Sequence, residues 1–238
     1  MPHRHPLLAR RIHRLACAAA WMATTLATPG VHATPLNTQL LVNGDAESGS
    51  TAGWTSTGID AVASGLAGSA GLPDGVSLGS FSFTGGTGSA ASQSLTQTVQ
   101  LDDIAAQIDA AQVAVDFSAL IQSRRDADTT DTAKATLRFL DAGGAVIADF
   151  DFFDAEVPLN NNAWSFVSLA QGLPTGTRAM QLLLDVRRSG GASSDGYFDN
   201  VWLSVSAVPE PGTWGLMALG LAAVVGRARL GRRPLAGG

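Results

Sequence analysis

Apolar residues alternate with polar or small residues along much of the chain. The alternation is clearest at residues 113–121 and 180–186, and it returns at residues 201–205. A period of two is typical of a strand with one buried face. Shorter or weaker versions of the pattern predict further strands at residues 38–42, 59–64, 76–84, 92–101, 137–139 and 164–169.

Turn-forming residues separate these segments, for example at residues 43–49, 85–88 and 141–144. The only helix predicted upstream of residue 208 is a short one that Asp102 caps and that ends near Ile108. About eight to ten short strands with almost no helix favour an all-β fold. We therefore predict an antiparallel two-sheet β-sandwich, or jelly roll.

The two ends of the chain depart from this pattern. At the N-terminus four arginines precede an apolar stretch at residues 15–27, and Val31 and Ala33 place small residues at −3 and −1 of a cleavage site. This order is typical of a secretory signal peptide. We expect signal peptidase to remove residues 1–33 and leave Thr34 as the mature N-terminus.

At the C-terminus Val208, Pro209, Glu210 and Pro211 precede an uncharged run that ends at Gly226. The prolines prevent any strand or helix from continuing through them. The run from Pro211 has 16 residues, about 24 Å as a helix, which is short for a bilayer core of about 30 Å. Four arginines follow it and favour a cytoplasmic end. We predict a short membrane helix within a tail of residues 208–238; the alternative is a buried helix of the folded body.

The body between these ends, residues 34–207, contains no cysteine and no histidine. This composition excludes Cys/His zinc sites, disulfides, Ser-His-Asp triads and Cys-His dyads. Seven Lys and Arg residues against 19 Asp and Glu residues give the body a net charge of −12. Such a charge disfavours nucleic acid and anionic lipid surfaces as partners and suits divalent cations or neutral polymers.

The tail resembles the PEP-CTERM sorting signal of exported proteins in Gram-negative bacteria. The resemblance rests on the order Val208-Pro209-Glu210-Pro211, short apolar helix and arginine cluster. It implies recognition by an exosortase, anchoring at the inner membrane, and removal of the tail near Pro209–Pro211. It also implies a final location at the cell surface or in the extracellular matrix, together with exopolysaccharide and biofilm.

The body resembles galactose-binding-like jelly rolls, which include several carbohydrate-binding modules. The matching segments are residues 41–49 with the following Gly53-Trp54, and residues 196–203 near the other end. The resemblance implies that these segments lie side by side. It further implies one structural calcium ion, held by Glu47, Asp199 and Asp45 with backbone oxygens of the turn. In the alternative without metal, Asp199 accepts backbone N–H groups from that turn.

Three tryptophans are candidates for sugar stacking. We expect Trp54 and Trp164 to be core residues. Trp202 is one residue out of step with Val201 and Leu203, so alternation turns it outward. It is the candidate sugar contact, and the alternative is a partly covered surface tryptophan.

Two acidic segments are candidate sites. Asp126, Asp128 and Asp131 contain only part of a calcium-binding pattern, and we favour a solvated tip loop for them. Asp149, Asp151, Asp154 and Glu156 suggest a glycosidase pair, but nothing in the sequence marks a buried acid among them. We therefore assign no catalytic residue.

The sequence thus predicts an exported, non-enzymatic β-sandwich with a structural or adhesive role. The first alternative is a carbohydrate-binding module that recognises exopolysaccharide, and a glycoside-active enzyme is the second. An exposed aromatic strip or a groove beside Trp202 would favour the carbohydrate-binding module.

Overall fold

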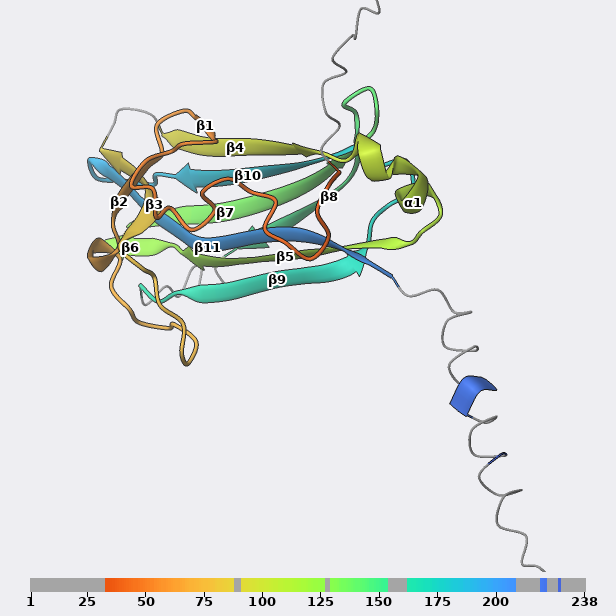
Figure 1. The fold of residues 1–238 in the computed structure, drawn as a ribbon. Helices are drawn as coiled ribbons and strands as arrows, with labels where there is room; N and C mark the ends of the chain where they lie inside the picture. The colour runs from red at the N-terminus through yellow and green to blue at the C-terminus, as the bar shows by residue number, and fades with distance from the viewer. Residues whose placement is uncertain are drawn as a thin grey trace, which may run out of the picture. The chain divides into compact units, whose positions relative to one another are not determined.

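The clearest alternations in the sequence all lie within strands of the computed structural model (Figure 1). The structure describes residues 33–87, 91–126, 129–153 and 162–208, together with residues 219–221 and Arg227. The elements are β1 (Thr55–Ser56), β2 (Asp60–Ala63), η1 (Ser64–Leu66), β3 (Phe81–Thr87), β4 (Ser92–Gln100), η2 (Asp102–Ile104), α1 (Ala105–Asp109), β5 (Val113–Gln122), β6 (Arg124–Asp126), β7 (Thr129–Leu140), β8 (Val146–Phe153), β9 (Ser165–Gly172), β10 (Ala179–Arg187) and β11 (Ser193–Ala207).

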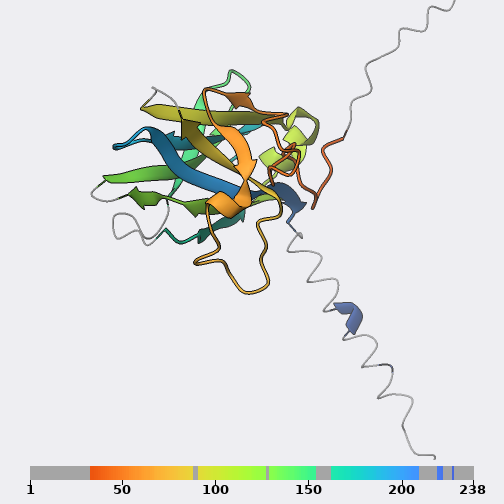
Figure 2. The ribbon, with the colours of Figure 1, turned by 90° about the vertical axis from the view of Figure 1, so that its left-hand side faces the viewer.

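The strands form two antiparallel sheets that pack face to face, which confirms the predicted sandwich (Figures 1 and 2). In the six-stranded sheet the order is β1-β4-β10-β7, and both β6 and β8 pair with the far edge of β7. In the five-stranded sheet the order is β2-β3-β11-β5-β9. The last strand is therefore central in its sheet, between β3 and β5.

The main core lies between the sheets. The inward residues of β5, from Val113 to Ile121, are at most 3% exposed, and Phe117 contacts Phe152 with ring centroids 4.7 Å apart. Trp54 joins this core against Phe83, as predicted.

A smaller apolar cluster lies on the outer side of the five-stranded sheet. It contains Ala67, Leu78, Leu120, Trp164 and Tyr197. The long connection that follows η1 supplies two of its members and covers that part of the sheet. Trp164 is therefore a buried residue as predicted, although it belongs to this outer cluster.

Residues 38–42 were predicted as a strand, and this prediction is wrong. The segment does follow β11, since the Leu40 N–H donates to the Leu203 carbonyl at 2.8 Å. The side chain of Gln39 then replaces a peptide group: its Nε2 donates to the Val201 carbonyl at 2.7 Å, and its Oε1 accepts the Leu203 N–H at 2.9 Å. Because a side-chain amide occupies these positions, no regular ladder forms.

Two boundaries also differ from their predictions. The strand expected from residue 76 begins only at Phe81, because Leu78 packs into the outer cluster instead. Asp102 does not cap the short helix. Leu101 occupies the cap position, and no side chain caps the helix there.

The predicted signal peptide lies outside the described residues, apart from Ala33. Most of the predicted membrane helix lies outside them too; of that run, Leu219, Gly220 and Leu221 are described and are helical. Within the described part of the chain, no helix is long and apolar enough to cross a membrane.

Candidate functional site

Trp202 points outward because of a β-bulge in β11. The register of β11 against β5 shifts between Asp199 and Trp202, and Asn200 has a φ of 48°, in the left-handed region. The extra residue resets the alternation, so Phe198 and Val201 both face the core. Trp202 is 42% exposed, which confirms the predicted orientation of its side chain.

An open groove of about 460 Å³ lies beside Trp202. Its other side is the turn that follows residue 39, and its lining residues are Gln39, Leu41, Asn43, Gly44, Asp45, Asn200, Val201 and Trp202. The turn can approach β11 this closely because it has a glycine there: a Cβ on Gly44 would lie 2.2 Å from the Val201 oxygen. The Val201 N–H donates to the Gly44 carbonyl at 3.0 Å, which fixes the two walls relative to each other.

The groove combines one aromatic face with uncharged amides and one carboxylate. Trp202 donates its indole N–H to Ser204 Oγ at 3.1 Å, which fixes the ring along the strand. Asn43 uses its side chain to hold the turn, through bonds to the Ser48 N–H and the Ser50 carbonyl. Asp45 is exposed, and only its Oδ1 accepts a hydrogen bond from the described residues. The indole of Trp202 can stack on the apolar face of a ring, and the polar groups beside it can accept hydrogen bonds from hydroxyl groups of the same ligand.

The acids predicted to bind calcium flank this groove. Glu47 Oε1 accepts the backbone N–H groups of Ser80 and Phe81, at 2.8 and 2.9 Å. Asp199 is fully buried; its carboxylate accepts the Ser82 hydroxyl at 2.8 Å and the Asn200 N–H at 2.6 Å. The hydrogen bonds to Asp199 thus come from the hydroxyl of Ser82, on the neighbouring strand β3, and from the backbone N–H of the next residue, Asn200. The turn, which the metal-free alternative named as the source of N–H groups, does not supply them.

Burial raises the pKa of Asp199 to about 7, although the hydrogen bonds from Ser82 and Asn200 oppose this shift. The negative charges of Glu47 and Asp45 raise it further, so these carboxylates lie close enough to interact electrostatically. Within the described ranges, however, no three acidic side chains are grouped so as to hold a metal ion. A three-carboxylate ligand set is therefore not formed in this structure, and the calcium ion stays a prediction.

A second polar surface lies on the outer face of the six-stranded sheet, which sequence reasoning did not single out. A pocket of about 350 Å³ there is lined by Ser92, Thr132, Lys134, Phe153, Asp185 and Arg187. The strand β8, which forms part of this surface, was not predicted from the sequence. Exposure alternates along residues 146–153, so Phe153 lies on the same outward face as Asp151.

Asp149 and Asp151 do share a face of β8, as a glycosidase pair would require, but Asp151 is already engaged. It accepts the Thr136 hydroxyl at 2.6 Å and forms an ion pair with Lys134 at 3.3 Å. The Thr136 hydrogen bond, and then the charge of Lys134, hold the pKa of Asp151 below its usual value. Asp154 and Glu156 lie outside the described residues.

Asp131 is not part of a solvated tip, contrary to the prediction for its loop. It is 5% exposed, and its two carboxylate oxygens accept the N–H groups of Ser189 and Asp195 at 2.7 and 3.0 Å. β6 and β7 form a hairpin here, which brings Asp131 back beneath the connection between β10 and β11. Asp128 lies outside the described residues.

The last strand ends at the predicted sorting motif. β11 extends to Ala207, and the Val208 N–H donates to the Gln112 carbonyl at 2.8 Å. Pro209, Glu210 and Pro211 lie outside the described residues. The described body therefore reaches the first residue of the motif without an intervening linker.

Residues 207–233 match the PEP-CTERM protein-sorting motif, which confirms the resemblance of the tail. The match includes Val208, Pro209, Glu210 and Pro211. The motif indicates an exported protein of Gram-negative bacteria that an exosortase sorts and that is processed at the membrane. No curated protein matches the chain in sequence.

Several solved structures are similar to the body in fold, including carbohydrate-binding modules. TmCBM61 in complex with β-1,4-galactotriose is 15% identical, over 70% of this chain and 97% of that one, with a TM-score of 0.47. The CBM22-1 xylan-binding domain of Paenibacillus barcinonensis Xyn10C is 16% identical, over 74% and 98%, with a TM-score of 0.37. The enzymatically active domain of bacteriophage CBA120 tailspike protein 4 is 18% identical, over 71% of this chain, with a TM-score of 0.46. This chain spans about a fifth (21%) of that tailspike chain.

Proposed function

We propose that the body is a non-catalytic carbohydrate-binding module, which the exported protein uses to contact exopolysaccharide at the cell surface or in the matrix. The observation that carries the proposal is the groove beside Trp202. Carbohydrate sites pair an aromatic face, which stacks on the apolar side of a sugar ring, with polar groups that bind its hydroxyls. The groove provides both.

The charge of the body supports a neutral partner. No lysine or arginine lines the groove, and the body carries a net charge of −12. Anionic polymers would be repelled at such a surface, whereas a neutral glycan pays no electrostatic cost. The fixed indole of Trp202 also reduces the entropy lost when a ligand binds.

The proposal includes no catalysis. A glycosidase needs one carboxyl group with a raised pKa and a second carboxylate that is free to act as base or nucleophile. Burial does raise the pKa of Asp185, but its neighbour Asp151 is held by Thr136 and Lys134 on an open sheet face. We therefore expect no hydrolysis of any polysaccharide that the protein binds.

The test is retention on polysaccharides, including those made by the producing bacterium, with Trp202→Ala beside the unchanged protein. Loss of stacking should weaken binding by about 0.5–1.5 kcal/mol, or roughly 2- to 13-fold. Trp202→Ala should melt almost like the unchanged protein because the side chain is outward. Trp54→Ala serves as the contrast, because truncating this core tryptophan should cost about 3–5 kcal/mol of folding free energy.

A purely structural or adhesive matrix protein is the second candidate. The large aromatic side chains Phe153, Phe166 and Trp202 are exposed on the outer faces of the two sheets and offer contacts to other proteins. If no polysaccharide retains the protein while it still accumulates in the matrix, this second function replaces the first.

A further inference from the structure

We propose that the binding surface extends from Trp202 across β5 to Phe166 on β9, and that it takes an internal stretch of an extended, neutral polysaccharide chain. This inference rests on the proposed carbohydrate-binding function and adds the class of ligand. Phe166 is 57% exposed and was not among the residues singled out from the sequence.

The register of the five-stranded sheet places the two aromatic residues on one face. Trp202 pairs with Ser118, and Ser118 pairs with Ser168, so these three residues form a row across three strands. Phe166 lies two residues from Ser168 and therefore points to the same side. Two strand spacings of about 4.8 Å and two residues of about 3.3 Å separate the two aromatic backbones by about 12 Å.

The side chains on the surface between the two rings are small. Ser118 is half-buried, and Ser168 and Ala170 are exposed on the outer face of β5 and β9. Neither Ser118 nor Ser168 forms a side-chain hydrogen bond with the described residues, so both hydroxyls are available to a ligand. A separation of about 12 Å between the two backbones is wider than one sugar ring, so a ligand that contacts both aromatic side chains is expected to be a chain of sugars.

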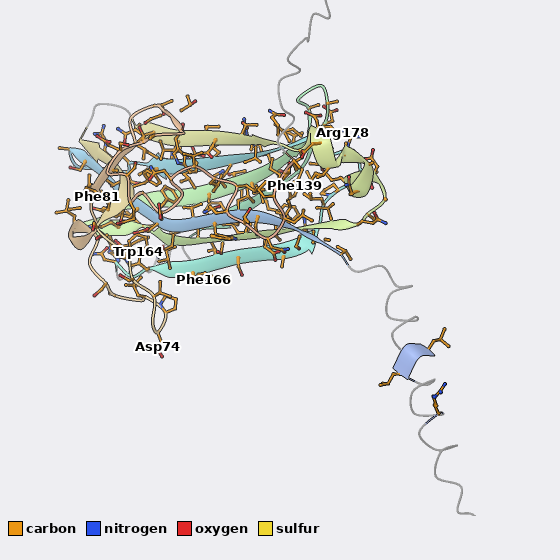
Figure 3. The ribbon with its side chains drawn as sticks, viewed as in Figure 1. Asp74, Phe81, Phe139, Trp164, Phe166 and Arg178 are labelled. Atoms are coloured by element: carbon orange, nitrogen blue, oxygen red, sulfur yellow. The ribbon has the colours of Figure 1, made fainter. Side chains whose placement is uncertain are left out.

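The long connection after η1 forms a wall at one end of this surface. Trp164 anchors it: the indole N–H donates to the Gly68 carbonyl at 3.0 Å, and the backbone N–H donates to the Ala70 carbonyl at 2.7 Å. Figure 3 shows Trp164 and Phe166 near each other at β9, with Asp74 at the tip of the connection. The connection buries Leu120 but leaves Phe166 exposed.

The charges of the two sheets distinguish neutral from acidic ligands. β5, β9 and β11 contain no lysine or arginine, and Asp116 is the acidic residue on the outer face beside Trp202. The outer face of the six-stranded sheet, in contrast, carries Lys134, Arg138 and Arg187. An acidic polysaccharide would find no cation on the Trp202–Phe166 surface, and so we assign this surface to neutral glycans.

The experiment is affinity electrophoresis of the protein in gels that contain xylan, galactomannan, hydroxyethyl cellulose or polygalacturonate. The variants are Trp202→Ala, Phe166→Ala and their combination. Phe153→Ala is the matched control, because Phe153 is 54% exposed on the other sheet. We expect retention by at least one of the three neutral polymers. Phe166→Ala should weaken it about 2- to 13-fold, with an unchanged melting temperature.

Oligosaccharides of the retained glycan separate the two aromatic contacts. Trp202→Ala should weaken the binding of short and long oligomers alike. Phe166→Ala should affect only oligomers long enough to reach both rings.

The outcomes distinguish this inference from the function on which it rests. If Phe166→Ala binds like the unchanged protein while Trp202→Ala loses retention, the extended surface is wrong and the function stands. Stronger retention by polygalacturonate, or an equal loss in Phe153→Ala, also overturns the inference. If the unchanged protein is retained by no polymer, the proposed function fails as well.

Discussion

Replacing Asp199 with asparagine should stabilise the protein at pH 8 and remove most of its pH dependence between pH 5 and 8. The folded protein holds the proton of Asp199 up to a pKa of about 7, whereas the unfolded chain releases it near the ordinary value of 3.8. Between these values the folded state binds more protons than the unfolded state. Stability therefore falls as the pH rises from about 4 to about 7, and it stays low above that.

The size of the effect follows from the shift in pKa. A difference of about three pKa units corresponds to about 4 kcal/mol in full, of which about 3 kcal/mol falls between pH 5 and 8. For a domain of this length, 1 kcal/mol moves the melting temperature by about 2–4 °C, so the unchanged protein should melt about 6–12 °C lower at pH 8 than at pH 5. The absence of histidine from residues 34–207 leaves few other groups that titrate in this range.

Thermal denaturation followed by circular dichroism is the assay, on protein that lacks the signal peptide and the apolar tail. Asp199→Asn keeps the shape of the side chain and should give nearly equal melting temperatures at pH 5 and 8. Asp185→Asn is measured beside it, because burial also raises the pKa of Asp185 and its share of the pH dependence must be separated from that of Asp199. Equal pH slopes in the unchanged protein and in Asp199→Asn, or stability that rises with pH, would refute the reasoning.

The same measurement tests the predicted calcium ion. If an ion binds the ionised Asp199 with Glu47, calcium should restore the stability lost at pH 8, since a ligand of the native state stabilises it by mass action. Asp199→Asn and Glu47→Gln should not respond. Identical melting with calcium and with chelator would remove the metal from the description of this site.

Two further predictions concern processing and the core. Mass spectrometry of surface-associated protein should find Thr34 as the N-terminus and no peptide that spans Ser206 to Arg227; recovery of such peptides would show that the tail is retained. Asp131→Ala should cost about 2–4 kcal/mol, because it leaves the N–H groups of Ser189 and Asp195 without their acceptor. Asp131→Asn, which keeps one acceptor oxygen, should lose about half as much in denaturant titration, and a loss below 1 kcal/mol in Asp131→Ala would contradict the burial of this carboxylate.

Local patterns in the sequence determined most of the strands and the outward direction of Trp202. Alternation specifies which face of its own strand a side chain occupies, so the inward residues of β5 and the position of Trp202 relative to Val201 follow from neighbouring residues alone. The sorting motif was recognised from its resemblance to PEP-CTERM signals, whereas local reasoning contributed only the break in regular structure at Pro209 and Pro211.

Where local patterns failed, a contact from a distant part of the chain was responsible. Residues 38–42 are typical of a short apolar strand, but the Gln39 amide pairs with β11 in place of a backbone ladder. The sequence places Asp131 in a charged loop, yet the backbone N–H groups of Ser189, in the connection before β11, and of Asp195, in β11, donate to its carboxylate. The partners of Gln39 and of Asp131 are all more than fifty residues away along the chain, so no local pattern in the sequence could reveal them.

The candidate site needed the tertiary structure for the same reason. Alternation places Trp202 outward on its own strand, but only the structure shows that Phe166 is exposed, and only the pairing of β9 and β11 with β5 brings the two residues onto one surface. The pKa of Asp199 likewise depends on its burial in the folded protein and on the charges of Glu47 and Asp45. Sequence periodicity fixes the direction of a side chain relative to its own backbone, whereas its neighbours, its burial and its charge environment are set by long-range strand pairing.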